Sequence, residues 1–587
     1  MMWEFFKFYL PTRVLYGPGL SKRIAEELRP YLKGNYRVLL LTDPFLVKNG
    51  TIDSIRQSLQ GSQLEIAAIF HDIPPNSELS VVEKATQLGV ESKCNFIMAI
   101  GGGSVMDTAK VVNILMVKGG DIHQHMGAQL IEGRVLLPSL FIPTTAGTGS
   151  EVTEFAVILD SQNKVKLPFT EEAILPDFAI LDPQLTVSMP PKLTAATGMD
   201  ALTHAIESFV SNQANPVSSS LAIYAVELIH ANILQACAVP DDLEARGAML
   251  VASFLAGVAF NHAGVGIVHA MSHALGGVYG IPHGVANSIM LPLGMEYNLE
   301  SSAHRYARLA EAIGVLNLKP AGELAKLSAH LPPLHSLLQN LSFVDEWLAL
   351  QKAQYFIQYI RQLNQRLKGL AGLPTNLREA GIEDGLGRLD EVVQKAMDDG
   401  AHLYNPRPAD AQEIRKMIRR AYEEEWPAIP TGKAEIKAAK LHAEKRRPKN
   451  VFKDEQMLYD ILLGFFEKLK EHPEIGPKLH ATGLSVRFNY ANPDSSIAID
   501  GRGPEVVFFK GEEARKFQAQ VEMSMQADFA HYFWHGKANL LQALARREVI
   551  AKGDVPSVMR LLPILEPAYD LYPRYLRERG LHKIIVD

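Results

Sequence analysis

Cysteine is almost absent from this sequence. Only Cys94 and Cys237 occur among 587 residues, which is too few for a disulfide framework and leaves no paired spacing for a thiolate metal motif. The scarcity excludes a small secreted fold held together by disulfides. It favours a reducing compartment, so we expect a cytoplasmic location.

A strong charge imbalance and a membrane-spanning run are also lacking. The 59 basic and 65 acidic residues leave a formal net charge of −6, too mild to indicate a nucleic-acid partner. Polar residues interrupt the longest apolar stretch, residues 247–277, so we expect buried helices there and no transmembrane segment. The first ten residues are aromatic, lack the features of a signal peptide and predict an edge strand.

The chain is long enough for several domains, and its first part has an alternating pattern. Apolar runs at residues 37–42, 64–70, 95–100 and 136–142 are separated by helix-like segments, which is typical of a parallel sheet. The third run leads into GGGSVMDTAK at residues 101–110. Such a turn between a strand and a helix offers backbone N–H groups and a positive helix end to a pyrophosphate, although it could also be only a tight turn.

Two more polar segments follow predicted strands. Asp43 comes directly after the first run, where a carboxylate can bind ribose hydroxyls and repel a 2′-phosphate, which favours NAD over NADP. The same residue could instead cap a helix. The segment PTTAGTGSE at residues 143–151 places hydroxyls and glycines after the fourth run. Because ligands gather at the carboxyl ends of parallel strands, the sequence predicts a dinucleotide-binding α/β domain.

Helical patterns replace strand patterns after about residue 190. Asp200 and His204 are four residues apart, as are His269 and His273, so each pair lies on one helix face. His283 stands between a proline and a glycine, and we expect it in a loop. A single histidine in an apolar wall is usually a satisfied core residue, but the repeated spacing favours a divalent transition-metal site. The expected helices are residues 194–210, 218–238, 243–261, 265–279, 295–313, 345–370 and 410–425.

The organisation changes again after residue 427. A stretch rich in lysine and arginine, residues 428–454, predicts a solvated linker. A third domain is expected at residues 455–587, where an amphipathic helix at 458–469 precedes a half-buried strand at 484–490. The further expected elements are strands at 497–500, 505–509 and 518–525 and helices at 527–535, 540–545 and 555–565.

Five motifs, in the same order along the chain, resemble the iron-containing (group III) alcohol dehydrogenases over about residues 5–427. They are GGGSVMDTAK, PTTAGTGSEVT, AILDP at 179–183, GMDALTH at 198–204 and HAMSHALGGVYGIPHGVAN at 269–287. The resemblance implies a dehydroquinate synthase-like fold, with an α/β NAD-binding domain at residues 1–186 and an all-helical metal-binding domain at 187–427. Residues 325–351 depart from the family pattern, which is usually shorter there.

The resemblance also implies roles for individual residues. Asp200, His204, His269 and His283 would be the metal ligands, with Fe²⁺ favoured by the family and Zn²⁺ compatible with the same donors. His273 would lie near the metal and the nicotinamide as a proton relay. The residues expected to contact NAD(P) are Asp43, Asn76, Gly102, Gly103, Ser104, Thr144, Thr145, Thr148, Val157 and Lys166.

Residues 455–570 are similar to sterol carrier protein 2-like (SCP2) lipid-transfer domains. The matching segments are VEMSMQADFAHYFWHGK at 521–537, ALA at 543–545, VIAKGD at 549–554 and MRLL at 559–562. The similarity implies an α+β fold with an apolar cavity for a lipid or acyl ligand. In the alternative interpretation, Met525, Phe529, Phe533 and Trp534 simply fill the core.

The multidomain chain is therefore expected to be a metal-dependent, NAD-linked alcohol dehydrogenase or aldehyde reductase acting on a primary or hydrophobic small-molecule alcohol. Its last domain would present the apolar substrate. Two alternatives remain open: a lipid carrier with a vestigial dehydrogenase scaffold, and a glycerol-type dehydrogenase of the same fold. The resemblance implies at least a homodimer, and the aromatic first strand offers an edge for pairing with a second subunit.

Overall fold

The computed structural model describes residues 5–75, 77–161, 165–314, 341–424, 451–538, 540–545, 549–554 and 562–586. Asn76, residues 428–450 of the expected linker, residues 325–340 of the unusual segment and residues 555–561 lie outside the described part. The chain divides into two compact units, Met1–Lys445 and Arg446–Asp587.

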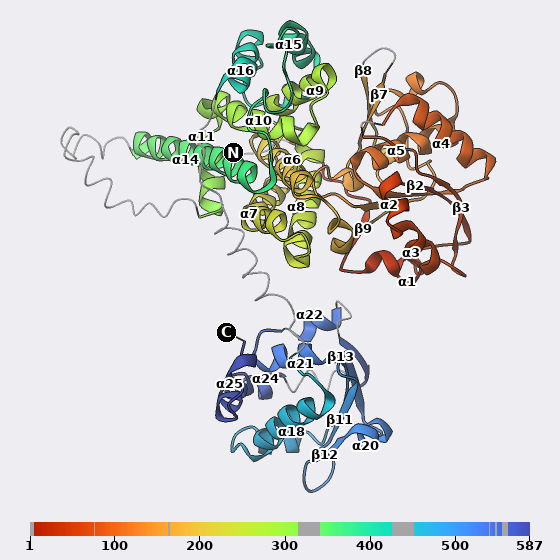
Figure 1. Ribbon diagram of the computed structural model, residues 1–587, viewed down its shortest axis with the longest axis vertical. Helices are drawn as coiled ribbons and strands as arrows, with labels where there is room; N and C mark the ends of the chain where they lie inside the picture. Colours follow the sequence, from red (N-terminus) through yellow and green to blue (C-terminus); the bar gives the residue numbers. More distant parts are fainter. Residues whose placement is uncertain are drawn as a thin grey trace, which may run out of the picture. The chain divides into compact units, whose positions relative to one another are not determined.

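A six-stranded sheet forms the framework of the first part of unit 1, and all of its pairings are parallel (Figure 1). The strand order is β1-β9-β6-β4-β2-β3. The chain runs from β2 outward to β3 and then back to β4, so the order reverses between β2 and β4. Ligands of open parallel sheets bind at the carboxyl end of such a reversal. The strands are β1 (Arg13–Tyr16), β2 (Tyr36–Leu41), β3 (Leu64–Phe70), β4 (Phe96–Gly101), β6 (Ser139–Pro143) and β9 (Phe178–Leu181).

Helices cover both faces of this sheet, which explains why its strands are continuous apolar runs. In β4, Ile97 and Ala99 pack into one core and Met98 and Ile100 into the other, because alternate side chains point to opposite faces. α4 and α5 lie on one face and α1 to α3 on the other (Figure 1). These helices are α1 (Ile24–Leu28), α2 (Pro44–Lys48), α3 (Thr51–Ser58), α4 (Leu79–Glu91) and α5 (Gly103–Lys118); a smaller sheet contains β5 (Gly127–Ala128), β8 (Val165–Thr170) and β7 (Phe155–Asp160).

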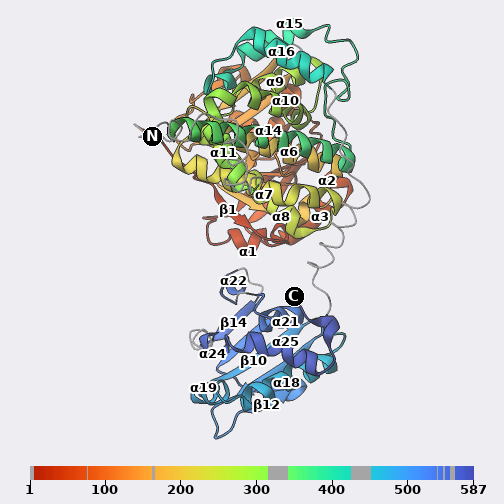
Figure 2. The ribbon, with the colours of Figure 1, turned by 90° about the vertical axis from the view of Figure 1, so that its left-hand side faces the viewer.

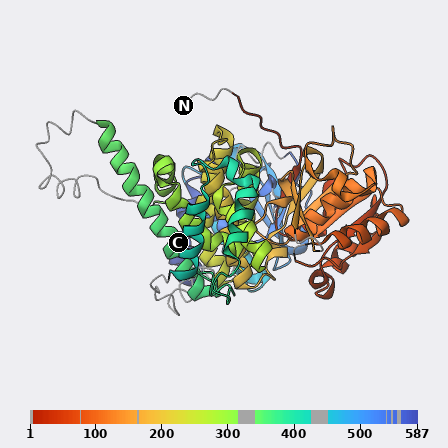
Figure 3. The ribbon, with the colours of Figure 1, turned by 90° about the horizontal axis from the view of Figure 1, so that it is seen from above.

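The second part of unit 1 is a group of helices around one apolar core, beside the red-to-orange α/β part in the view from above (Figure 3). By length and composition alone, α7 and α8 could each cross a membrane. They pack against each other and against α6, so the core of this region accounts for their apolar character. The helices are α6 (Pro191–Val210), α7 (Pro216–Ala238), α8 (Leu243–Ala263), α9 (Ile267–Tyr279), α10 (His283–Tyr297), α11 (Leu299–Ala312), α14 (Leu341–Ala371), α15 (Leu389–Asp398) and α16 (Ala411–Glu423), with short 3₁₀ turns η3 (Ser150–Val152) and η6 (Gly400–Tyr404).

Three predictions from the sequence are wrong. Residues 5–12 form no strand; the ring of Phe8 stacks on His262, and Lys7 pairs with Glu172, so side chains hold this segment instead of a sheet edge. The helix expected at 295–313 is two helices, α10 and α11, with Asn298 between them. His283 does not lie in a loop but begins α10, because Pro282 can occupy the position before a first helical turn.

Unit 2 is a five-stranded mixed sheet in the order β12-β11-β10-β13-β14, in which β10 and β13 are parallel and the other pairs antiparallel. α18, α21 and α25 pack on one face of the sheet (Figure 2), where Phe465 contacts Trp534 and Tyr572 edge to face. The elements are α18 (Glu455–Glu471), α19 (Gly476–Ala481), β10 (Ser485–Ala491), β11 (Ser495–Asp500), β12 (Val507–Lys510), α20 (Gly511–Lys516), β13 (Val521–Gln526), α21 (Ala527–Trp534), α22 (Leu540–Ala545), β14 (Val549–Gly553), α24 (Leu562–Leu565) and α25 (Ala568–Glu578).

Two glycines allow the α/β part of unit 1 to touch the helical part. Gly149, just before η3, has a φ of 62°, and its backbone lies against Gly257 in the middle of α8. A Cβ atom added at Gly257 would lie 2.9 Å from the Cα of Gly149, closer than packed atoms allow. The loop that follows β6 is therefore held directly against α8.

We predict that Gly257→Ala destabilises the protein by about 1–3 kcal/mol, because overpacking this contact outweighs the better helix propensity of alanine. The matched control is Gly277→Ala in α9, where an added Cβ meets nothing within 4 Å. The control should leave stability unchanged or raise it by up to about 1 kcal/mol. Thermal and denaturant unfolding of both variants would test this, and equal responses would contradict it.

Candidate metal centre and cofactor-binding loops

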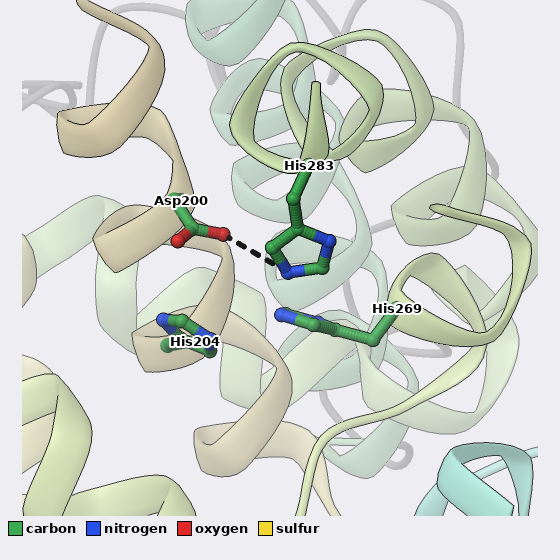
Figure 4. Close-up of side chains that lie close together, drawn as sticks. All are labelled: Asp200, His204, His269 and His283. Atoms are coloured by element: carbon green, nitrogen blue, oxygen red, sulfur yellow. Dashed lines mark ion pairs between the residues drawn. The ribbon is translucent and has the colours of Figure 1, made fainter. Parts of the chain in front are cut away.

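Asp200, His204, His269 and His283 converge on one point (Figure 4). Each offers one ligand atom, and the four atoms all lie within 4.8 Å of one another. α6 contributes the first two residues, α9 the third and α10 the fourth. Three of the side chains are buried and His283 is half-buried, so the site opens on the His283 side.

Helix packing explains how three helices meet here. Asp200 and His204 are one turn apart on α6, as their spacing predicts. Gly284, directly after His283, lies so close to α6 that an added Cβ would be 2.3 Å from the carbonyl oxygen of Ala196. A larger residue at 284 would push the start of α10 away. The Nε2 atom of His283 consequently lies 3.4 Å from Oδ1 of Asp200.

The chemistry of these donors fits a divalent transition metal. Ligands about 2.0–2.2 Å from a central ion lie within a few ångströms of one another, as these four atoms do. Burial lowers the pKa values of His204 and His269, which keeps the imidazoles neutral, as metal binding requires. Burial also raises the pKa of Asp200; a cation beside this carboxylate would compensate for its loss of water. The residues present therefore fit the metal that the sequence predicts.

Glu207, one further turn along α6, supports His269 from behind. Its buried carboxylate accepts a hydrogen bond from Nδ1 of His269 at 2.6 Å. It also accepts backbone N–H groups at the start of α9, from Gly266 at 2.9 Å and Val268 at 2.7 Å. Burial raises the pKa of Glu207 to about 7. Because Nδ1 is engaged, Nε2 of His269 faces the other donors.

Asn287, one turn after His283 on α10, lies among the donors. Its Nδ2 atom donates to Oδ1 of Asp200 at 2.7 Å and lies 3.2 Å from Nε2 of both His269 and His283. Neither Asn287 nor Glu207 was predicted from the sequence as part of the site. Their only signal is spacing, since each stands three or four residues after a histidine of the site in an apolar helix.

His273 lies beside the four-donor cluster and not within it. Its ring stacks on that of His283, with 5.1 Å between centroids and an angle of 15°. Its Nδ1 atom lies 2.8 Å from Oδ2 of Asp399, a residue that the sequence analysis missed. Burial acts to raise the pKa of Asp399, but the hydrogen bond and charge of His273 and the backbone N–H of Ala401 together outweigh it and hold this pKa below its usual value.

The structure brings most of the expected cofactor residues to one edge of the sheet. Gly102, Gly103 and Ser104 begin α5, where β4 ends. A Cβ on Gly102 would lie 3.2 Å from Thr145, and one on Gly103 would lie 2.8 Å from Thr148, so the glycine-rich loop packs directly against the loop after β6. Thr144 N donates to Gly101 O at 2.9 Å and joins the two loops.

The other expected cofactor residues that the structure describes lie after β2 or in the three-stranded sheet of β5, β7 and β8. Asp43 follows β2, and its carboxylate caps α2 by accepting the backbone N–H of Leu46 at 3.0 Å. Val157 is in β7 and donates its backbone N–H to Asp107 at 3.1 Å. Lys166 is in β8, opposite Leu159. The fold therefore places Asp43 at the same sheet edge as the glycine-rich loop, next to the reversal of strand order.

A buried lysine, which the sequence analysis also missed, connects α5 to this edge. The Lys110 ammonium donates to Ser150 Oγ at 3.0 Å and to the carbonyl oxygens of Thr153 and Phe155 at 2.8 and 2.7 Å. Burial lowers the pKa of Lys110 to about 8. These bonds hold the loop after β6 between α5 and the helical region.

A glycine-rich loop at the carboxyl end of a parallel sheet, together with a cluster of three histidines and one carboxylate, is the arrangement expected of a metal-dependent oxidoreductase that uses a dinucleotide. Comparison with known proteins agrees with this class. The family model for iron-containing alcohol dehydrogenases matches residues 11–183, and the model for the C-terminal part of that family matches residues 194–422. The chain belongs to the iron-containing alcohol dehydrogenase family.

Individual relatives cover the same part of the chain. The chain is similar to NAD-dependent methanol dehydrogenase of Bacillus methanolicus, 34% identical over 414 residues, which are 70% of this chain and 99% of the relative. Long-chain-alcohol dehydrogenase 1 of Geobacillus thermodenitrificans is 40% identical over 294 residues, 49% of this chain and 73% of the relative. A crystal structure of 1,3-propanediol oxidoreductase is 35% identical with a TM-score of 0.63, covering 71% of this chain and 100% of that one.

These findings confirm an enzyme of this family with iron and NAD as its cofactors. They also confirm the α/β and helical parts of the expected fold. Neither family model extends past residue 422, and unit 2 lies beyond that point.

Glu207→Gln is predicted to weaken iron binding by about 10–100-fold. Both carboxylate oxygens of Glu207 accept hydrogen bonds, whereas glutamine has one accepting oxygen, so the orientation of His269 would be lost. Equilibrium competition with a chelator, read as iron per chain, measures the effect. Glu300→Gln on the exposed surface of α11 is the control and should bind iron like the unaltered protein. Unchanged iron affinity in Glu207→Gln would show that Glu207 does not support the site.

Proposed function

We propose that this protein is an iron-dependent, NAD-linked alcohol dehydrogenase or aldehyde reductase, with Asp200, His204, His269 and His283 as the metal ligands. One observation carries the proposal: in a chain of this family, these four donors meet within 4.8 Å. The bound iron would act as a Lewis acid toward the oxygen of the alcohol. The chain's own residues then have to orient the ligands, hold NAD and accept a proton.

The cofactor would lie along the sheet edge. Gly102, Gly103 and Ser104 would direct backbone N–H groups and the start of α5 at the pyrophosphate. Thr144, Thr145 and Thr148 would hold the part of NAD nearest the helical region, with Val157, Lys166 and Asn76 as further contacts. Asp43 favours NAD over NADP, since its carboxylate would repel a 2′-phosphate.

His273 would carry the proton away during alcohol oxidation. Its side chain is 31% exposed, so it has access to water, and it stacks on His283 at the open side of the site. A histidine in this place can accept the proton that the alcohol loses when hydride passes to NAD.

Aromatic side chains beside the metal ligands support a primary or hydrophobic alcohol as the substrate. The ring of Phe260 stacks on His204 at 4.4 Å, and Phe155 lies 5.9 Å from Phe260. Such rings offer apolar contact to an alkyl group. This favours a hydrophobic alcohol over the glycerol-type alternative. The opposite direction, aldehyde reduction, uses the same contacts.

Replacing His269 with alanine is predicted to abolish NAD-linked alcohol oxidation, with a loss of at least about 10³-fold in kcat/KM, and to remove most of the bound iron. Steady-state NADH formation and metal analysis of the same preparation provide the test. His304→Ala, on the exposed side of α11, is the control and should retain both. Full turnover with retained iron in His269→Ala would refute the ligand assignment.

For unit 2 we propose an SCP2-like apolar binding domain that presents the hydrophobic end of a substrate to the dehydrogenase by tethering it nearby. A pocket between α18, α19 and the sheet supports this; Phe466, Leu479, Val486, Phe488 and Trp534 are among its walls. The cavity volume of about 100 Å³ is below the roughly 300–1,000 Å³ of sites for drug-sized ligands. An alkyl chain therefore suits this pocket better than a sterol. The metal-donor cluster in unit 1 disfavours the alternative in which the whole protein is chiefly a lipid carrier.

Filling this pocket should remove the binding of alkyl chains. In the full-length protein, Leu479→Trp is predicted to weaken the binding of 1-octanol to unit 2 at least about 10-fold by calorimetry, because the indole occupies the cavity. Ile550→Trp, at a 53% exposed position of β14 away from the pocket, is the control. If unaltered protein and Leu479→Trp bind octanol equally, the pocket is not the binding site.

We propose domains at residues 1–186, 187–427 and 455–587, joined by a basic linker at 428–454.

A homodimer or larger homo-oligomer is proposed as well, and the exposed aromatic residues Phe5 and Phe6 provide an apolar surface for a second copy. Both cysteines are buried and free, which suits a cytoplasmic location. Native mass spectrometry would give the number of subunits.

A further inference from the structure

The hydrogen bond between His273 and Asp399 connects two segments that are 126 residues apart. His273 is in the middle of α9, and Asp399 lies between the end of α15 and the start of η6. The Asp399 side chain is 22% exposed, so it is largely shielded from water. Its Oδ2 atom meets Nδ1 of His273 at 2.8 Å, and its Oδ1 atom accepts the backbone N–H of Ala401 at 2.8 Å. Both carboxylate oxygens therefore have fixed partners.

The segment that carries Asp399 is itself anchored to the helix that carries His273. Asn405, just after η6, exchanges two hydrogen bonds of 2.8 Å with Asn298, and both amides are buried. Asn405 Oδ1 also accepts the backbone N–H of Ile267, the first residue of α9, at 3.3 Å. Because these bonds hold η6 against the start of α9, the carboxylate of Asp399 has a defined position relative to the His273 ring.

We propose that Asp399 is a positioning residue for His273. A carboxylate that accepts from Nδ1 fixes the tautomer in which the proton is on Nδ1 and the lone pair on Nε2. It also fixes the plane of the ring, which lies within 15° of the His283 ring. This inference rests on the proposed role of His273 as the proton relay.

The proposed arrangement gives every proton and electron a destination. During oxidation, the C–H bond of the alcohol breaks and both electrons leave with hydrogen as hydride to NAD⁺. The O–H bond breaks as the C=O bond forms, and Nε2 of His273 accepts that proton. The imidazolium keeps the proton on Nδ1, which still donates to Asp399, and then releases the Nε2 proton to water.

The test compares Asp399→Asn with its neighbour Asp398→Asn. Asp398 is exposed and accepts a hydrogen bond from Gln394, one turn before it on α15. An amide at 399 can donate to Nδ1 and select the wrong tautomer, so we expect kcat to fall about 10²–10⁴-fold. The KM, the bound iron and the melting temperature should stay within error of the unaltered protein, as should all four quantities in Asp398→Asn. Asp399→Glu, which keeps the charge, should retain more of kcat than Asp399→Asn.

His273→Ala and the double variant with Asp399→Asn complete the cycle. If Asp399 acts through His273, the double variant is no slower than His273→Ala alone. Unchanged kcat in Asp399→Asn, additive losses, or a loss of iron and stability that parallels the loss of kcat would each overturn the inference. If His273→Ala keeps full kcat, the proposed relay itself fails; if only His273→Ala is slow, the relay stands and the role of Asp399 fails.

Discussion

Burying a carboxylate and three imidazoles in an apolar helical core costs free energy unless a cation compensates them. In this protein Asp200, His204 and His269 are almost fully buried, and the half-buried His283 lies with them in one cluster. Glu207 accepts a hydrogen bond from the outward-facing Nδ1 atom of His269, and Asn287 donates one to Oδ1 of Asp200 among the donors. A divalent ion among the four donors would offset this cost. Binding one ion requires α6, α9 and α10 to bring their donors together.

The second constraint is that the glycine-rich loop after β4 and the loop after β6 must lie next to the metal site. The contact between Gly149 and Gly257 and the bonds of buried Lys110 hold the loop after β6 between the sheet and the helices. Without side chains at the two glycines, the loop can approach α8 closely. Chemistry between a nicotinamide and a metal-activated alcohol depends on such fixed placement, because misplacement by about 1 Å can cost 10²-fold in rate.

The sequence predicted the parts of the fold that depend on local pattern. Continuous apolar runs located β2, β3 and β4, and the four-residue spacing placed Asp200 and His204 on one helix face. It could not predict Glu207, Asn287 or Asp399, because their roles arise from hydrogen bonds between segments far apart in the chain. The prediction of a loop at His283 was wrong because a proline before this residue is compatible with both a turn and the start of a helix. The strand predicted in the first ten residues is not formed by their described part, residues 5–10, because side-chain contacts and not a sheet hold this segment.

The proposed mechanism requires iron to be held by Asp200, His204, His269 and His283 and to face NAD. Anomalous diffraction at the iron absorption edge, from crystals of the full-length protein grown with NAD, would locate both. We expect one strong peak bonded to these four side chains, with the pyrophosphate of NAD at Gly102–Ser104. An iron peak at other residues, or NAD bound away from that loop, would contradict it.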